Sequence, residues 1–252
     1  MYSDKAFLKI FIEMGEALLL SGAEIFRVED TLNRMGRACG AVDMNVFVIT
    51  SSIVITMEFP DGVVLTRTKR IRSAGGNDFV RLGQLNDISR EFCKQPFSAQ
   101  ELEMRIRKVC QTPSLKWQQL AGNVIAGVSF TIFYGGSLAD GAGAAVAAVW
   151  LWLLQQYVMS YCMNQVTFQF VASFLMGCVI CALSRICPVL SMSRMMIGDI
   201  MLLVPGLMAT NAIRDILIGD TISGFMRFIE AVLLAAVLAL GIIASICLFR
   251  LF

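Results

Sequence analysis

The sequence predicts an α-helical integral membrane bundle of about five transmembrane helices, one of them broken, preceded by a small soluble α/β domain. Two observations predict this fold class. Only ten of the 40 charged residues lie between positions 119 and 252. The same region contains near-continuous apolar runs such as Ile222–Phe249, whose 28 residues exceed the roughly 20 that one bilayer crossing needs. We therefore expect a soluble domain over residues 1–118 and a transmembrane helical domain over residues 119–252.

The composition supports a membrane protein and excludes several classes of function. Hydrophobic residues make up 57% of the chain, and the mean hydropathy is +0.70, above the range of soluble domains. The net charge of +2 without a basic run argues against nucleic acid as a partner. Histidine is absent, which removes Ser-His and Cys-His nucleophiles and His-ligated metals. The eight cysteines lack zinc-like or disulfide-like spacing. We expect no catalytic residue, no metal site and no cofactor.

Two helices open the soluble domain. Apolar residues recur at helical spacing over Asp4–Leu20. Ser21 followed by Glu24 matches a capping box, which predicts a second helix from about Gly22 to Gly40.

A short sheet and two more helices complete that domain. β-branched and aromatic residues dominate between positions 44 and 68 and are interrupted by a turn at 60–62, which predicts two or three antiparallel strands. Amphipathic patterns then predict helices over Asp78–Cys93 and Ala99–Cys110, the latter opened by a capping box of Ser98 and Glu101.

Five apolar segments define the expected membrane half. They are Leu120–Tyr134, Leu138–Tyr157, Val166–Leu183, Met195–Thr210 and Ile222–Phe249. The first and fourth are short, and the fourth contains Pro205 and Gly206, which predict a broken helix. Interrupted membrane helices are typical of transporter sites, because their free backbone groups face a bound solute.

The charges that flank the first apolar segment predict the orientation. Arg105, Arg107, Lys108 and Lys116 precede it, whereas the following loop at 135–137 carries no cation. By the positive-inside rule we expect the soluble domain to face the cytoplasm, although five spans would then place Arg185, Arg194 and Arg250 on the outer side.

The few polar groups of the membrane half are the candidate functional residues. Asp199 lies inside an apolar segment, where it acts either in proton coupling or in a structural salt bridge. Beyond the break, Arg214 is a candidate anchor for a substrate carboxylate, because a guanidinium group binds carboxylates bidentately. Thr210, Asn211 and, more weakly, Asn123 are the further candidates for substrate binding.

One face of the last apolar segment is also polar. Asp220, Ser223, Arg227 and Glu230 follow one another at helical spacing. Arg227 and Glu230 are spaced to form an ion pair. This face is either a structural pairing network or part of the site, with Arg227 binding substrate and Glu230 coupling to protons.

At these residues the chain resembles the threonine/serine exporter superfamily. One stretch of likeness runs from Leu18 to Glu24 and continues with Arg27-Val28-Glu29. The other begins at Val204-Pro205-Gly206 and continues through Asn211, Arg214, Asp215, Gly219, Asp220, Ser223, Gly224, Arg227, Glu230 and Ala231. The likeness covers essentially the whole chain.

The resemblance implies secondary export of small carboxylates or amino acids, such as threonine, serine or succinate, across the bacterial inner membrane. The chain looks like the larger subunit of a two-component form, which implies a small integral-membrane partner or a homo-oligomer. The resemblance transfers no catalytic signature to residues here.

Two other functions remain open from the residues alone. A membrane-anchored structural or sensory protein would use the soluble domain to signal to a partner. A membrane-bound hydrolase would need a Ser–Lys or acid pair, for which Ser51, Ser52 and Lys69 are available but not singled out by their spacing.

Overall fold

The computed structural model describes residues 2–71, 76–113 and 115–250, so residues 251 and 252 of the expected membrane domain lie outside the described residues. The described residues form ten α-helices, one short 3-10 helix and three strands. They divide into two compact units. Unit 1 comprises residues 1–113 and 210–228, and unit 2 comprises residues 114–209 and 229–252. The segment 210–228 thus joins the N-terminal unit, although it lies within the region expected to form the membrane domain.

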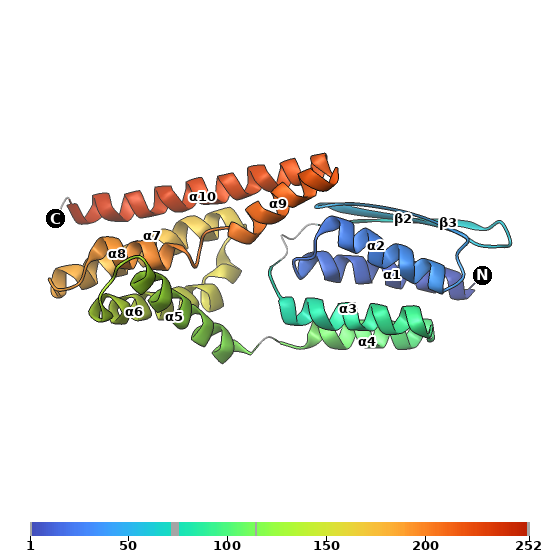
Figure 1. The fold of residues 1–252 in the computed structure, drawn as a ribbon, viewed down its shortest axis with the longest axis horizontal. Coiled ribbons are helices and arrows are strands. Elements are labelled where there is room, and N and C mark those ends of the chain that lie inside the picture. The colour runs from blue at the N-terminus through green and yellow to red at the C-terminus, as the bar shows by residue number, and fades with distance from the viewer. Residues whose placement is uncertain (1, 72–75, 114, 251–252) are drawn as a thin grey trace. The chain divides into compact units, whose positions relative to one another are not determined.

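Unit 1 is built on a three-stranded antiparallel sheet in the order β1-β2-β3, which confirms the expected strands. Figure 1 shows α1 and α2 between this sheet and the helix pair α3 and α4. The elements are α1 (Tyr2–Leu20), α2 (Ile25–Ala38), β1 (Asp43–Ile49), β2 (Ser52–Glu58), β3 (Val64–Arg70), α3 (Phe79–Lys94) and α4 (Ala99–Gln111).

The core of unit 1 follows from the alternation along the central strand. Ile53, Ile55 and Met57 point to the same face of β2 and are fully buried. Phe11 of α1 and Leu32 of α2 are fully buried in the same cluster. The helices therefore cover one face of the sheet.

The structure corrects one predicted helix start and supports another. Ser21 does not cap α2: its hydroxyl donates to the carbonyl of Ala17 at 2.7 Å. Glu24 occupies the N-cap position, and its side chain makes no capping hydrogen bond. The Ser21 hydroxyl is therefore occupied by a bond to the last turn of α1. Short polar side chains often bond to nearby backbone groups in this way. Ser98, in contrast, accepts the backbone N–H of Glu101 and caps α4.

Unit 2 consists of apolar helices. They are α5 (Lys116–Phe133), α6 (Leu138–Tyr157), the short η1 (Met159–Tyr161), α7 (Gln165–Ile186), α8 (Met192–Ile200), the first residues of α9 (Gly206–Ile218) and most of α10 (Thr221–Arg250). Among the described residues, three helices are long and apolar enough to cross a membrane, namely α6, α7 and α10. The predicted count of five spans is not confirmed.

The apolar segment between Met195 and Thr210 forms parts of two helices. Helix α8 ends at Ile200, and α9 begins at Gly206, directly after Pro205. Proline has no backbone N–H and disfavours helical geometry in the residue before it, so a helix cannot continue unchanged through this point. The amide of Gln169 on α7 donates to the carbonyl of Leu203 at 2.6 Å and so satisfies one backbone acceptor at the interruption.

Candidate functional site

A buried carboxylate without a hydrogen-bond partner lies in unit 2. Asp199 on α8 is 0% exposed. Neither of its oxygens has a hydrogen-bond partner among the described residues. A Cβ atom added at Gly127 of α5 would lie 2.6 Å from Oδ1 of Asp199. The carboxylate therefore packs against the bare backbone of α5, where an ionised group would carry a large desolvation cost.

A second buried polar group lies along the same contact between α5 and α8. Thr131 is one turn beyond Gly127 on α5, is fully buried, and its hydroxyl has no hydrogen-bond partner in the described structure. A Cβ atom added at Gly198 would lie 2.7 Å from the backbone nitrogen of Thr131. Two glycines, one on each helix, thus permit the close approach. The sequence did not single out Thr131, although its spacing of four residues from Gly127 was a usable signal.

Asp140 shows how a satisfied buried acid looks in the same unit. Its carboxylate accepts the N–H and the hydroxyl of Ser137 at 2.8 and 2.9 Å, and the N–H of Ser191 at 2.6 Å. The bond from the Ser137 N–H, together with the Asp140 N–H that donates to Ser137 Oγ at 3.1 Å, forms a capping box at the start of α6. The bond from the Ser191 N–H fixes the residue before α8. Asp140 is therefore structural, and its full set of bonds contrasts with the bare carboxylate of Asp199.

The other candidates in unit 2 are less enclosed. Asn123 on α5 donates to the side-chain oxygen of Gln155 on α6 at 3.0 Å, a bond that links the two helices. Glu230 on α10 is half-buried.

A network of charges lies in unit 1, where the N-terminus of α2 meets segment 210–228. Arg214 on α9 pairs with Glu24 at 2.6 Å. The second oxygen of Glu24 lies 3.6 Å from the guanidinium of Arg27. Glu24 is mostly buried, whereas Arg214 is about half exposed. One carboxylate therefore holds two guanidinium groups.

The neighbouring ion pair is buried and differs from the predicted one. Arg227 pairs with Asp215 at 3.3 Å, with side chains 13% and 1% exposed, and not with Glu230. The carboxylate has no aligned hydrogen bond among the described residues. The guanidinium also donates to the carbonyl of Ala23 at 3.4 Å. Helical spacing put Glu230 within reach of Arg227, which is why the sequence predicted that pair. In the structure, the turn at Gly219 brings Asp215 to the Arg227 guanidinium instead.

The turn between α9 and α10 allows this pairing. Gly219 has a φ of +107°, a conformation that favours glycine. A Cβ atom added at Gly224 would lie 2.7 Å from the carbonyl oxygen of Ala212. Only a residue without a side chain lets α10 approach α9 this closely.

The structure divides the predicted site residues between the two units. Arg214, Asn211, Thr210 and Arg227 belong to unit 1, and Asp199, Asn123 and Glu230 belong to unit 2. Asn211 is half-buried and Thr210 is exposed. Within unit 1, Arg214 and Arg227 both contact the start of α2. The sequence could not identify this contact, because the partners lie about 190 positions apart.

Glu29 is a further acid of unit 1 with an altered proton affinity. Its Oε1 accepts the N–H of Val48 in β1 at 2.8 Å. Burial raises the pKa of Glu29 above its ordinary value, and the nearby charge of Asp220 adds to this, while the hydrogen bond from Val48 opposes it.

Two of the residues considered for hydrolase chemistry, Lys69 and Ser52, make other contacts. The amine of Lys69 pairs with Glu16 at 2.5 Å. The hydroxyl of Ser52 donates to the backbone carbonyl of Lys69 at 3.4 Å rather than to its amine.

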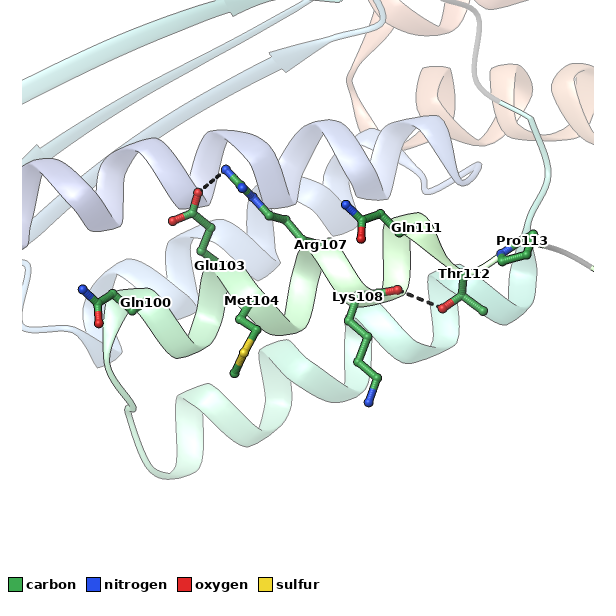
Figure 2. Close-up of a pocket in the computed structure, with 8 residues that line it drawn as sticks. All are labelled: Gln100, Glu103, Met104, Arg107, Lys108, Gln111, Thr112 and Pro113. Carbon is green, nitrogen blue, oxygen red and sulfur yellow. Dashed lines mark hydrogen bonds and ion pairs between the residues drawn. The ribbon is translucent and has the colours of Figure 1, made fainter.

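Figure 2 shows a surface groove of about 760 Å³ that is lined by α4 and the turn after it, from Gln100 to Pro113. Glu103 and Arg107, which are paired with each other, lie on its rim. All its lining residues come from this one stretch of chain, so groups from different elements do not converge there.

Comparisons with known proteins give one result. The model of the ThrE family, described as "Putative threonine/serine exporter", matches residues 9–249. Searches of curated proteins and of solved structures gave no significant match.

Proposed function

Since this chain belongs to the threonine/serine exporter family, we propose that it is one subunit of a secondary transporter that exports small carboxylates or amino acids across the bacterial inner membrane. Threonine, serine and succinate represent the substrate class. In this proposal residues 1–118 lie in the cytoplasm, and residues 119–252 form the membrane domain, of which segment 210–228 packs within the N-terminal unit. The family match and the three long apolar helices support the proposal.

The observation that carries the proposal is the bare carboxylate of Asp199. An acid that is fully buried among apolar helices without a partner is costly to keep ionised. A cost of this kind is tolerated where the group takes up and releases a cation during function. We assign Asp199 to proton coupling, with Glu230 as the second candidate on α10.

Arg214 is the proposed anchor for the substrate carboxylate. Its guanidinium already holds the carboxylate of Glu24 at 2.6 Å and remains about half exposed. A carboxylate ligand would meet the same planar set of donors. Asn211 and Thr210 precede Arg214 on α9, and we assign them to the same region. Arg227 and Asn123 are the remaining proposed contacts.

The proposed partner is a small integral-membrane subunit or a second copy of this chain. The reason is the resemblance to one half of longer, ten-helix family members. If the chain is such a half, transport requires the other half.

The test is an efflux assay in reconstituted vesicles with labelled threonine, serine and succinate, with and without the candidate partner. We expect efflux of one of them that depends on the pH gradient and on the partner. No transport of any of the three with the partner present would refute the proposal.

Two variants test the residue assignments. Asp199→Asn should remove the pH dependence of efflux more than it weakens substrate binding. Arg214→Lys keeps the charge but loses the planar fork, so transport should fall while insertion persists.

Asp140→Asn is the matched control, because Asp140 is equally buried but fully hydrogen-bonded. It should lower stability and leave the pH dependence of the residual efflux intact. Wild-type pH dependence in Asp199→Asn would exclude Asp199 from coupling.

A further inference from the structure

A second polar site lies within unit 1. Helices α2, α3 and α9 enclose a pocket of about 600 Å³. Its lining includes residues of α2 from Glu24 to Arg34, residues of α3 from Asn86 to Lys94, and Arg214 and Ile218 of α9. Three separate elements therefore contribute side chains to one hollow, unlike the groove of Figure 2.

The charge of this pocket is strongly positive. Five cations line it, namely Arg27, Arg34, Arg90, Lys94 and Arg214. Only two acids, Glu24 and Asp30, line it with them. A third acid, Asp87, lies outside the lining and pairs with Arg90 at 3.8 Å, so three acids face five cations and two positive charges remain in excess. A single carboxylate would leave half of that excess unbalanced, whereas an anion with two or more carboxylates would balance it.

The existing ion pairs show how such an anion would be held. Glu24 binds Arg214 at 2.6 Å and lies 3.6 Å from Arg27. On the same helix, Arg34 pairs with Asp30 at 2.9 Å. Glu24 thus occupies, from within the protein, the position that a ligand carboxylate would take between two guanidinium groups. The arginine side chains remain more than half exposed, so a ligand can reach them.

We propose that this pocket binds a small anion with two or more carboxylates. One ligand carboxylate competes with Glu24 for Arg27 and Arg214, and another meets Arg34, Arg90 and Lys94. Because Arg214 is also the proposed anchor for exported substrate, this inference rests in part on the proposed function. It adds that the N-terminal unit collects the carboxylate, or senses it, through groups of α2 and α3.

The test is a binding titration of the purified full chain in detergent, without any gradient. The probes are citrate, succinate, acetate and pyrophosphate. We expect citrate and succinate to bind at least ten-fold more tightly than acetate, because acetate carries one carboxylate. Equal affinity for acetate, or tighter binding of pyrophosphate than of citrate, would overturn the assignment to a multivalent carboxylate.

Two variants with opposite expected effects sharpen the test. Arg34→Gln should weaken citrate binding about five-fold, since it removes one exposed charge-assisted contact. Glu24→Gln should tighten citrate binding. It removes the negative charge that competes with citrate for Arg27 and Arg214, and glutamine has nearly the same size and shape as glutamate. Weaker binding in Glu24→Gln would contradict the competition.

Arg107→Gln is the matched control. Arg107 is 60% exposed and pairs with Glu103 four residues earlier, as Arg34, 71% exposed, pairs with Asp30. It lies in the other groove (Figure 2). Its loss should leave citrate affinity unchanged, and an equal loss of affinity in both variants would show general charge screening instead of a site.

Binding and transport separate the two proposals. If no probe binds saturably and efflux persists, the pocket carries no such site and the proposed export stands. If citrate binds as described but no tested acid is exported, the pocket assignment stands and the proposed export fails.

Discussion

The buried ion pair between Arg227 and Asp215 should hold α9 against the start of α10 within segment 210–228. The two groups lie 3.3 Å apart, with side chains 13% and 1% exposed. At an effective dielectric constant of about 20, their attraction is about 5 kcal/mol. Replacing Arg227 with methionine leaves a carboxylate buried without a counter-charge. Breaking one partner of such a pair costs about 3–5 kcal/mol.

Hydrogen exchange of the full chain in detergent measures this cost locally. A loss of about 3 kcal/mol lowers the protection of the α9 amides roughly a hundredfold, since 1.4 kcal/mol is tenfold. Exchange in α7, which belongs to unit 2, serves as the internal control and should not change.

A double variant isolates the pair from general disruption. Asp215→Leu combined with Arg227→Met removes both charges and leaves no buried unpaired group, so it should restore most of the protection lost in Arg227→Met. The reasoning is refuted if the double variant is as poorly protected as the sum of the single ones. It is also refuted if Arg227→Met exchanges like the wild type.

Three further predictions concern packing, pH and capping. Gly198→Ala places a methyl group 2.7 Å from the α5 backbone and should destabilise unit 2 by about 1–3 kcal/mol, measured by thermal unfolding monitored by tryptophan fluorescence. Gly122→Ala, which meets open space, should not, and equal effects would contradict the close approach. In the wild type, the stability of unit 1 should decrease as the pH rises above 4.5, because Glu29 then loses its proton in a buried site. Glu29→Gln should lack this decrease. A raised folded-state pKa means that the folded state binds more protons in that range, and an unchanged pH profile in denaturant titrations would refute it. Ser98→Ala should speed amide exchange in the first turn of α4 by roughly the tenfold or less that one lost N-cap implies, whereas Ser21→Ala should leave the first turn of α2 unchanged, and the reverse result would restore the predicted capping box.

Local patterns in the sequence were enough to locate most helices and strands. β-branched and aromatic residues between positions 44 and 68, interrupted by a turn at 60–62, predicted the strands that became β1, β2 and β3. Apolar runs predicted α6, α7 and α10 to within a few residues. These signals work because the side-chain periods of 2.0 and 3.6 residues depend only on neighbours in the chain.

The candidate site residues were selected because charged residues are rare in the second half of the chain, and not from any knowledge of their geometry. Asp199 and Arg214 were chosen because few charges remain in the second half of the chain. The structure places them in different units. It also adds Thr131, a neutral residue whose burial without a partner is invisible to a count of charges.

The sequence by itself determined that the chain has a charged N-terminal region and an apolar C-terminal region. It also determined the approximate bounds of the helices in each region. Only the tertiary structure decided that segment 210–228 packs with the N-terminal unit and that Arg227 pairs with Asp215. It also brought the two stretches of family likeness together, because Glu24 holds Arg214 across about 190 positions. The physical reason is the distance along the chain over which each interaction acts. Periodicity and capping act over a few residues, whereas burying a charge requires a partner that the folded chain can deliver from any distance along the sequence.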